Sequence, residues 1–400
     1  MSPLRDIFVE FFKLGLTSFG GPSAHIAYFR ERFVEKKNWL DESEFAALLA
    51  LTQFLPGPGS SQLGMAIGWK KGGVPGSLAA FLGFTLPSAV LMILFALGVM
   101  KFGSLTDGEA GWIRGLQIAV VVVIANAVWS MAKTLCVGKT RSLIAISTAA
   151  IVLSVDSVWT QVGVICFGVV AGSVLLRNEP DSTGYNARLN RVQSETQQGT
   201  VGFSVFCLVA FTMILLAIPW LVNSGNELIR AFAGMYKSGA LVFGGGHVVL
   251  PLLSRETVDA GWLGAPEFAA GYGAAQAVPG PLFTISSYLG AVLKNPAGPW
   301  VAGLVCTIGI FLPGWLLTLG TLPFRERMKN VRALQKALAG ANAAVVGLLG
   351  AALYDPVWLR SIRNAEDVVF LLGVSALLLV FKLPPWLVVI TAGVVGGFLY

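Results

Sequence analysis

The chain is poor in charge and in the residues on which metal centres and disulfide frameworks depend. Only 12% of its 400 residues are charged, roughly half the share that a soluble domain carries. It contains two histidines, and its four cysteines (Cys136, Cys166, Cys207 and Cys306) form no CxxC pair. These counts argue against a metal cluster and against a disulfide framework.

The motifs of common soluble enzymes are also missing. The sequence has no P-loop, no GxSxG, no HExxH and no regularly spaced carboxylate pair, so we predict no enzyme activity, no cofactor and no metal. The net charge of +7 comes from Lys and Arg in short loops, where anionic lipid headgroups attract them. We therefore predict no nucleic-acid partner.

Apolar residues dominate instead, at 55% of the chain with a mean hydropathy of +0.73. The first apolar stretch contains Glu10 and Lys13 and lacks a small-residue cleavage site, unlike a signal peptide. Several later stretches approach the roughly 20 residues that span a bilayer. We predict an all-α polytopic membrane protein with roughly 10–13 membrane segments. The apolar stretches are 75–100, 113–132, 142–153, 158–176, 201–222, 298–322, 338–353, 367–381 and 386–400.

One long motif occurs twice in the chain. Residues 44–58 read EFAALLALTQFLPGP and residues 267–281 read EFAAGYGAAQAVPGP, with 8 of 15 positions identical at an offset of 223. Each copy follows a Phe-Gly-Gly run, at 19–21 and 243–245, and a Leu-Pro pair follows each copy. In a membrane protein, such a duplication indicates a transporter whose site lies at the interface between the repeats.

The distribution of Lys and Arg predicts that the two halves are inserted in opposite orientations. The loop 29–43 carries four of these residues and its counterpart 252–266 carries one, whereas 100–114 carries two and its counterpart 323–337 carries five. Positive loops stay cytoplasmic, so the second half is inverted and 252–266 is external. The predicted domains are a first repeat (1–176), a polar linker with an extra membrane segment (177–222) and a second, inverted repeat (223–400).

The same count favours a re-entrant hairpin at each Pro-Gly-Pro motif. If residues 44–70 crossed the membrane once, Lys70 and Lys71 would lie opposite the positive loop 29–43, against the charge bias. A segment that dips in and returns removes this conflict. The alternative is an ordinary span that is kinked at proline.

The chain breaks can bind an anion. Pro56 and Pro58 end a helix, and a new helix near Gly59 would present free N–H groups at its positive dipole end. Two such ends from opposite halves could replace the hydration shell of a small oxyanion. The alternative is a packing kink that binds no ligand.

Polar residues recur at matched places beside the breaks. His25 and His247 follow the glycine runs, and Gln53 and Gln276 lie three residues before the first proline of each turn. Each histidine could contact the anion, titrate during transport or form a structural hydrogen bond. Each glutamine could donate to the anion or join neighbouring helices.

Two further pairs of residues are matched between the halves. Glu44 and Glu267 begin the repeated motif, where they could favour the helix dipole or carry protons. Gln117 and Asn342 lie in later apolar segments beside small residues, and they look like interhelical hydrogen-bonding residues at least as much as site residues.

The combined motifs FGGP…H, TQFLPGPGSSQLG and FGGGH…AQAVPGPLFT resemble the chromate ion transporter family in its long, two-domain bacterial form. The resemblance covers essentially the whole chain. It implies a multi-pass protein of the bacterial cytoplasmic membrane that exports chromate, driven by the proton-motive force, and so gives chromate resistance. Sulfate, a tetrahedral dianion of similar size, is the natural competing ligand.

We expect the anion to contact the broken segments of both halves. In the second copy, residues 282–285 replace a glycine and two polar residues of 59–62, so the halves are not expected to be equivalent. The candidate substrate-binding residues are Gly20, Gly21, Ser23, His25, Gln53, Pro56, Gly57, Pro58, Gly59, Ser60, Ser61, Gly244, Gly245, His247, Gln276, Pro279, Gly280, Pro281 and Thr284.

The expected partners are a chromate or sulfate oxyanion, the lipid bilayer and protons as a coupling ion; a homodimer is compatible with the sequence. Two other functions remain open at this point. One is a sulfate importer coupled to cations, because import of a dianion opposes the membrane potential. The other is a membrane-embedded enzyme or a structural subunit, for which the sequence offers no nucleophile or metal-ligand constellation.

Overall fold

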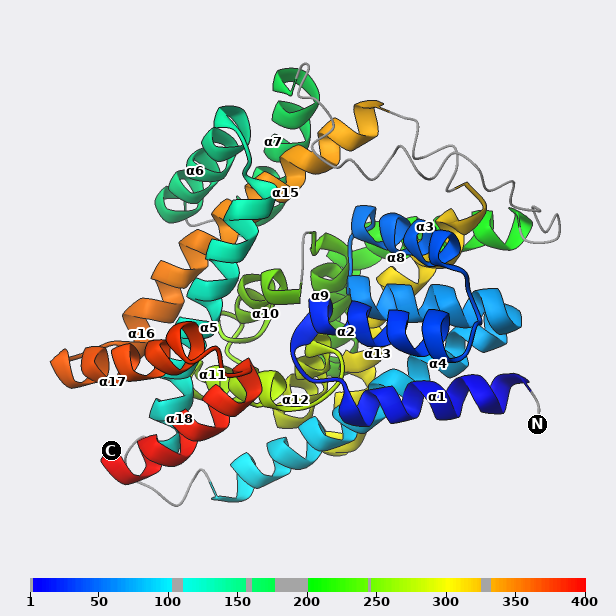
Figure 1. Ribbon diagram of the computed structural model, residues 1–400. Coiled ribbons are helices and arrows are strands. Elements are labelled where there is room, and N and C mark those ends of the chain that lie inside the picture. The colour runs from blue at the N-terminus through cyan, green and yellow to red at the C-terminus, as the bar shows by residue number, and fades with distance from the viewer. Residues whose placement is uncertain (1–2, 103–110, 156–159, 177–200, 244–245, 325–331) are drawn as a thin grey trace.

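In the computed structural model, the part of the chain that is described consists of helices and their connections, without a β-strand (Figure 1). The described residues are 3–102, 111–155, 160–176, 201–243, 246–324 and 332–400. The positions at 244–245 and the linker 177–199 lie outside them.

The helices of the first half run from the right of Figure 1, where α1, α3 and the start of α4 lie, to the left, where α5, α6 and α7 lie. They are α1 (Pro3–Thr17), α2 (Gly21–Arg30), η1 (Glu31–Lys36), α3 (Glu42–Phe54), α4 (Gly59–Phe102), α5 (Gly111–Leu135), α6 (Lys139–Ser154) and α7 (Thr160–Leu175).

The second half repeats this order after one extra helix, α8 (Val201–Val222). Its elements are α9 (Glu227–Leu241), η4 (Gly246–Val248), α10 (Val249–Thr257), α11 (Ala265–Ala277), η5 (Leu282–Thr284), α12 (Ile285–Val292), α13 (Gly298–Thr321), η6 (Leu322–Phe324), α15 (Arg332–Ala352), η7 (Leu353–Trp358), α16 (Leu359–Ser361), α17 (Ala365–Ser375), η8 (Ala376–Val380) and α18 (Pro385–Leu399).

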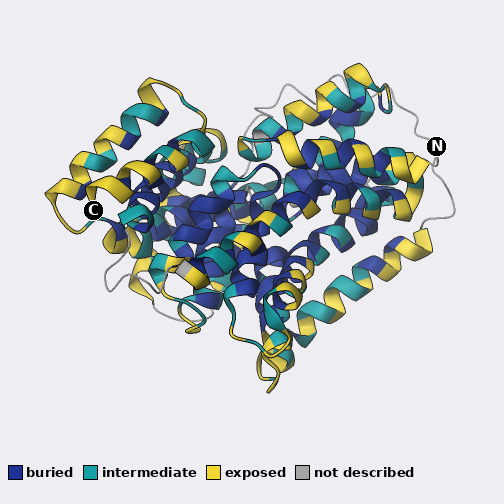
Figure 2. Ribbon diagram, turned by 90° about the horizontal axis from the view of Figure 1, so that it is seen from below, coloured by how far each residue is buried: buried dark blue, intermediate teal, exposed yellow. Residues whose placement is uncertain are grey.

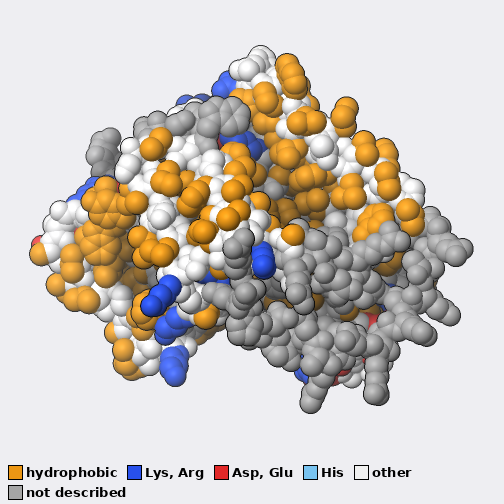
Figure 3. All heavy atoms as spheres, turned by 90° about the horizontal axis from the view of Figure 1, so that it is seen from above, with side chains coloured by type: hydrophobic (Ala, Val, Ile, Leu, Met, Phe, Trp, Pro, Cys, Tyr) orange, Lys and Arg blue, Asp and Glu red, His pale blue; other side chains and the backbone are white. Residues whose placement is uncertain are grey.

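The apolar stretches form helices as predicted. Within the described residues, five helical stretches are long and apolar enough to cross a membrane, and three further apolar helices are shorter. The five are Gly59–Lys101, Gly111–Leu135, Val201–Val222, Gly298–Phe324 and Gln335–Ser361. Large apolar side chains cover much of the outer surface, such as Trp220 at 75% and Phe398 at 87% exposed (Figure 3). A soluble monomer rarely exposes so much apolar surface, whereas lipid would cover it.

The first Pro-Gly-Pro motif forms a re-entrant hairpin, as predicted. Helix α3 ends at Phe54, residues 55–58 turn, and α4 begins at Gly59. The Lys70 Nζ atom lies 2.5 Å from Glu44 Oε1, so the start of α3 meets the chain twelve residues into α4. Gly72 and Gly73 then interrupt α4 with non-helical dihedral angles. An ordinary kinked span would place Glu44 and Lys70 at opposite ends, so that alternative is wrong.

The second copy folds in the same way. Helix α11 ends at Ala277, residues 278–281 turn, and η5 and α12 return. The Tyr288 hydroxyl of α12 donates a 2.8 Å hydrogen bond to the carbonyl oxygen of Glu267, near the start of α11. The hairpin is therefore closed by a contact between its two arms, as in the first half.

Matched glycines pack the first helix of each half against a later one. A Cβ on Gly15 of α1 would lie 2.8 Å from the Phe84 carbonyl oxygen of α4. In the second half, a Cβ on Gly239 of α9 would collide with the Ile310 carbonyl oxygen of α13. Small residues allow such close backbone approach between membrane helices.

Two other glycine crossings connect opposite halves of the chain. Helix α5 packs on α18, where Gly115 faces the Ala392 carbonyl group, and α15 packs on α7, where Gly340 faces the Gly168 carbonyl group. Each pair combines one helix from each half, and Figure 1 shows both pairs on the same side of the molecule. The two halves are therefore interlocked and do not form separate bodies.

The buried core lies where the hairpins meet the long helices (Figure 2). Helix α12 packs against both α4 and α13, and α4 also contacts α13. Helix α11 joins this group to the other side, because it packs on α5 and α18. The hairpin turns are consequently enclosed by helices of both halves.

The glycine crossing at Gly340 predicts a sharp difference between two substitutions in α15. Gly340→Val would drive a side chain into the Gly168 carbonyl oxygen, whereas Gly350 has no neighbouring atom within 4 Å of its would-be Cβ. We expect Gly340→Val to lower the free energy of unfolding by at least about 1–3 kcal/mol, as overpacking does. Gly350→Val, with the same residue on the same helix, serves as the control. Thermal unfolding of the purified variants in detergent measures both; equal melting temperatures would contradict the crossing.

Candidate functional site

The central glycine of each Pro-Gly-Pro turn is hydrogen-bonded to the opposite half of the chain. The Gly57 N–H donates to the Val242 carbonyl oxygen over 2.7 Å, and the Gly280 N–H donates to the Ser18 carbonyl oxygen over 2.9 Å. Val242 and Ser18 each precede the Phe-Gly-Gly run of their own half. Each turn is thus held against the segment that precedes the glycine run of the other half.

These turns need glycine. Gly57 has φ 123° and Gly280 has φ 98°, a backbone region that other residues rarely adopt. A Cβ on Gly57 would lie 3.2 Å from the Cα of Gly314, and one on Gly280 would lie 2.9 Å from Ser88 Oγ. The two turns are therefore packed against backbone and side chains of the opposite half.

The residues that follow the two glycine runs also approach one another. A Cβ on Gly246, directly after the second run, would lie 3.5 Å from the ring of Pro22, which follows the first run. It would lie 3.4 Å from Leu282, just beyond the second turn. The two turns and the described residues beside the glycine runs therefore lie in one region, to which both halves contribute.

His25 connects the two turns. Its Nε2 atom lies 3.2 Å from the Ser18 carbonyl oxygen, which also accepts from Gly280, and its Nδ1 atom lies 3.2 Å from Ser60 Oγ. A carbonyl oxygen only accepts, so Nε2 carries a proton, and in the neutral ring Nδ1 accepts from the Ser60 hydroxyl. The His25 side chain is fully buried, edge-on to the Phe84 ring at 5.2 Å.

Several buried polar atoms near the breaks have no hydrogen-bond partner among the described residues. They include the hydroxyls of Ser18, Ser61 and Thr85 and the Oε1 atom of Gln62. A buried polar group without a partner costs about 1–3 kcal/mol, so native proteins rarely retain one without a reason. The hydroxyl hydrogens of Ser18, Ser61 and Thr85 therefore have no acceptor among the described residues.

The two turns are not equivalent, as the sequence indicated. Helix α4 begins directly at Gly59, whereas the second turn leads into the short 3₁₀ helix η5 before α12. The Thr284 hydroxyl donates to the Pro281 carbonyl oxygen over 2.8 Å, which uses it within the turn. The stronger set of free donors lies in the first copy, at the positive end of α4.

The other candidate residues are distributed unevenly. Gly20 and Gly21 form the break before α2, and Pro56, Pro58, Pro279 and Pro281 lie in the turns. Gln276 is half-buried and Gln53 is exposed, which separates Gln53 from the buried groups at the turns. Gly244, Gly245 and the side chains of Ser23 and His247 lie outside the description.

Five residues at or near the turns were not predicted from the sequence as site residues: Ser18, Gln62, Thr85, Ser88 and Val242. Gln62 shows why, since its Nε2 donates to Pro56 and to Gly314, 252 positions away. A signal was present for some of them, because Ser18 and Val242 adjoin the glycine runs and Thr85 lies in the repeated Gly-x-x-Leu-Pro segment.

Glu44, the first of the two matched glutamates, has a structural explanation. Glu44 completes a capping box with Asp41 at the start of α3 and pairs with Lys70. This supports the interpretation of Glu44 as a helix-start charge. Gln117, by contrast, does not join helices through its oxygen, because its buried Oε1 atom has no partner among the described residues.

Comparison with known proteins agrees with this arrangement of two matched halves. The family model described as "Chromate transporter" matches residues 5–173 and 229–397. The chain belongs to the chromate transporter family. The match occurs twice, once on each side of α8, and transport is what the family's members are named for.

Curated relatives cover most of the chain. The chromate transport protein of Pseudomonas aeruginosa is 28% identical over 88% of this chain and 80% of its own length. The chromate transport protein of Cupriavidus metallidurans is 27% identical over 95% and 88%. An uncharacterized transporter of Methanocaldococcus jannaschii is 27% identical over 98% and 93%. No solved structure matches the chain.

The turn geometry predicts that Gly57 and Gly280 are more sensitive than a matched glycine elsewhere. Gly57→Val and Gly280→Val each combine a positive φ with a clash against the other half, whereas Gly261 has φ 75° and no atom within 4 Å of its would-be Cβ. We expect the two turn variants to lose at least about tenfold in chromate transport, since the strain and the clash together exceed about 1.4 kcal/mol. Gly261→Val carries the strain alone and should transport. Uptake into vesicles, corrected for the amount of protein in the membrane, measures this; wild-type transport by Gly280→Val would refute the importance of the turn.

Proposed function

We propose that this protein exports chromate from the cytoplasm across the bacterial cytoplasmic membrane and so confers chromate resistance. The anion would pass the region where the two turns and the residues beside the glycine runs lie. The observation that carries this proposal is a set of buried hydroxyls without a partner among the described residues. They belong to Ser61 in the first turn of α4, Ser18 beside the second turn, and Thr85 next to Phe84, the ring against which His25 packs. The substrate is inferred from the family, and these hydroxyls would provide hydrogen-bond donors for it.

The donors suit a tetrahedral dianion. Burial of an anion in a low-dielectric interior is prohibitive unless hydrogen bonds and dipoles replace its water. The first turn of α4 offers the N–H groups of Gly59, Ser60 and Ser61 at the positive end of the helix dipole. Several modest donors without a fixed cation would bind the ion weakly enough to release it again.

The membrane potential favours export. An inside-negative potential contributes about 2.3 kcal/mol per elementary charge per 100 mV, and chromate carries two charges. That corresponds to a concentration gradient of roughly three decades. Export can therefore run on the potential alone.

His25 gives protons a way to affect the site. In the neutral ring, Nδ1 accepts the Ser60 hydroxyl hydrogen; a proton on Nδ1 reverses this bond, because Nδ1 must then donate to Ser60 Oγ. The Ser60 hydroxyl hydrogen would be released towards the anion, and a positive charge would appear beside it. Binding of a proton and binding of the anion would thus favour one another at this position. The proton would act on anion binding only, because a proton exported with the anion would oppose the potential that drives export.

Purified protein in liposomes provides the direct test of function. With a potential negative on the side that corresponds to the cytoplasm, we expect chromate to move to the other side and to carry current. Sulfate should compete, because it has the same shape and charge. Protein-free liposomes and Gly280→Val are the controls. Movement of sulfate alone, or of chromate only against the potential together with cations, would contradict the proposed export.

The His25 proposal predicts a change in pH dependence. His25→Gln keeps a donor for the Ser18 carbonyl group but cannot titrate, so transport should persist at a reduced rate and lose its rise at acidic pH, where a buried imidazole takes up its proton. Ser60→Ala removes the hydroxyl that is hydrogen-bonded to His25 Nδ1, and it should flatten the pH profile of transport in the same way. An unchanged pH profile in His25→Gln would show that protons do not affect transport through His25.

A further inference from the structure

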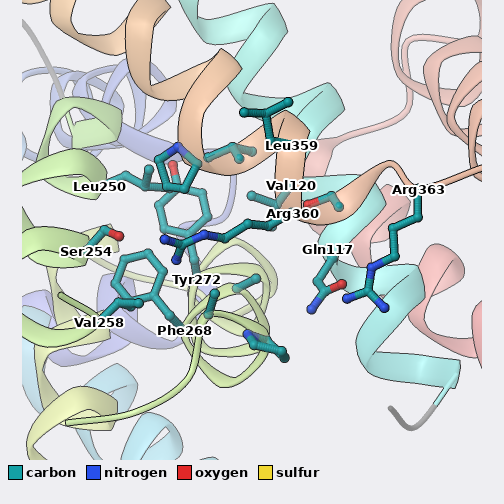
Figure 4. A pocket seen from close by; sticks show the side chains of 16 residues that line it. Gln117, Val120, Leu250, Ser254, Val258, Phe268, Tyr272, Leu359, Arg360 and Arg363 are labelled. Atoms are coloured by element: carbon teal, nitrogen blue, oxygen red, sulfur yellow. The ribbon is translucent and has the colours of Figure 1, made fainter. Parts of the chain in front are cut away.

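A cavity of about 320 Å³ lies apart from the chain breaks, between α5, α10, α11 and the segment η7–α16 (Figure 4). Polar groups enter it from every side. Gln117 comes from α5, Ser254 from α10, Tyr272 from α11, and Arg360, Ser361 and Arg363 come from α16 and the residues after it. The function proposed above does not use this cavity.

The lining of the cavity is positively charged. It contains Arg360 and Arg363, and no Asp or Glu is among the described residues that line it. Figure 4 shows the Arg360 side chain extending between Ser254 and Tyr272, while the Arg363 side chain lies beside Gln117. Guanidinium groups present several N–H donors in a planar fork, which suits oxyanions.

Gln117 is the second observation that indicates a ligand. Its side chain is only 4% exposed, and its Oε1 atom has no hydrogen-bond partner among the described residues. The oxygen and nitrogen of an amide exchange places by a rotation about its last side-chain bond, so Gln117 can present an N–H₂ group to the cavity. A bound oxyanion would use this amide together with the two arginines.

Helix α11 leads from the cavity to the second Pro-Gly-Pro turn. Phe268 and Tyr272 line the cavity, and Tyr272 shares a side-chain hydrogen bond with Gln276 one helical turn further on. Gln276 lies three residues before Pro279, where the turn begins. One face of α11 thus connects the cavity to the chain breaks.

We propose that this cavity is a second oxyanion site, which receives the anion on the external side after it leaves the chain breaks. The external position follows from the charge bias, which places residues 252–266 outside the cell, and it rests on the proposed export. The ligand class is a free tetrahedral dianion such as sulfate or chromate. A lipid phosphate shares the same chemistry and is distinguished by the experiment.

The test uses the reactivity of one cysteine in the cavity. Val258, which is half-buried and lines the cavity, is changed to Cys in a chain whose four native cysteines are replaced. The full-length protein is reconstituted in neutral lipid and treated with a negatively or a positively charged thiosulfonate reagent. We expect the negative reagent to react faster and sulfate to slow it several-fold. Sulfate is the probe because chromate oxidises thiols.

Matched charge removals identify the groups that bind. Arg360→Gln should reduce the preference for the negative reagent by about fivefold and abolish protection by sulfate. Lys294→Gln removes an exposed positive charge outside the cavity, and it should change neither the preference for the negative reagent nor the protection by sulfate. Equal rates for the two reagents, or protection that survives Arg360→Gln, would overturn the proposal. So would protection by anionic lipid but not by sulfate, which would assign the cavity to a headgroup.

The outcome is separable from that of the proposed function. Gly280→Val blocks transport at the turn but leaves the residues lining the cavity in place, so protection by sulfate should persist in that variant. Protection without chromate transport in the unmodified protein would refute export alone. Transport without protection would refute the cavity site alone.

Discussion

The structure depends on two backbone hydrogen bonds, one from each Pro-Gly-Pro turn to the opposite half. Within a membrane, broken backbone survives only when its polar groups are satisfied by the protein or line a cavity. Gly57 and Gly280 achieve this by donating to the carbonyl groups of Val242 and Ser18. Each half therefore completes the other's broken segment, and neither turn could be placed in the same way without its partner repeat.

The same dependence extends outward through the glycine crossings. Helix α5 packs on α18 and α15 packs on α7, so each half contributes one helix to each crossing. The chain breaks are thereby held between helices of both halves, with His25 connecting the two turns through Ser18 and Ser60. A network of this kind can respond to a proton and an anion together, because the direction of one hydrogen bond depends on the charge of the ring.

Much of the architecture could be predicted from residue patterns. The repeated motif indicated the duplication. The position of Lys70 relative to the positive loop 29–43 predicted a hairpin, and the ion pair between Lys70 and Glu44 confirms it. The pairing of Gly280 with Ser18 could not be predicted, because one sequence does not specify which residue 262 positions away completes a turn. Gln53 was included through its repeat position and lies exposed. Gln117, for which the sequence left an interhelical role and a site role open, lines a cavity. Periodicity identifies helices, but it does not identify their partners.

The central claim is that each turn lies against the opposite half, and a cysteine pair tests it most directly. The would-be Cβ of Gly280 lies 3.3 Å from the Cβ of Ser88, close to the separation found in disulfides. In a chain without native cysteines, Ser88→Cys combined with Gly280→Cys should form an intramolecular disulfide on mild oxidation, detected by mass spectrometry. Ser88→Cys combined with Gly261→Cys is the control and should not cross-link. A turn pair that stays reduced, or a control pair that oxidises equally well, would contradict the account.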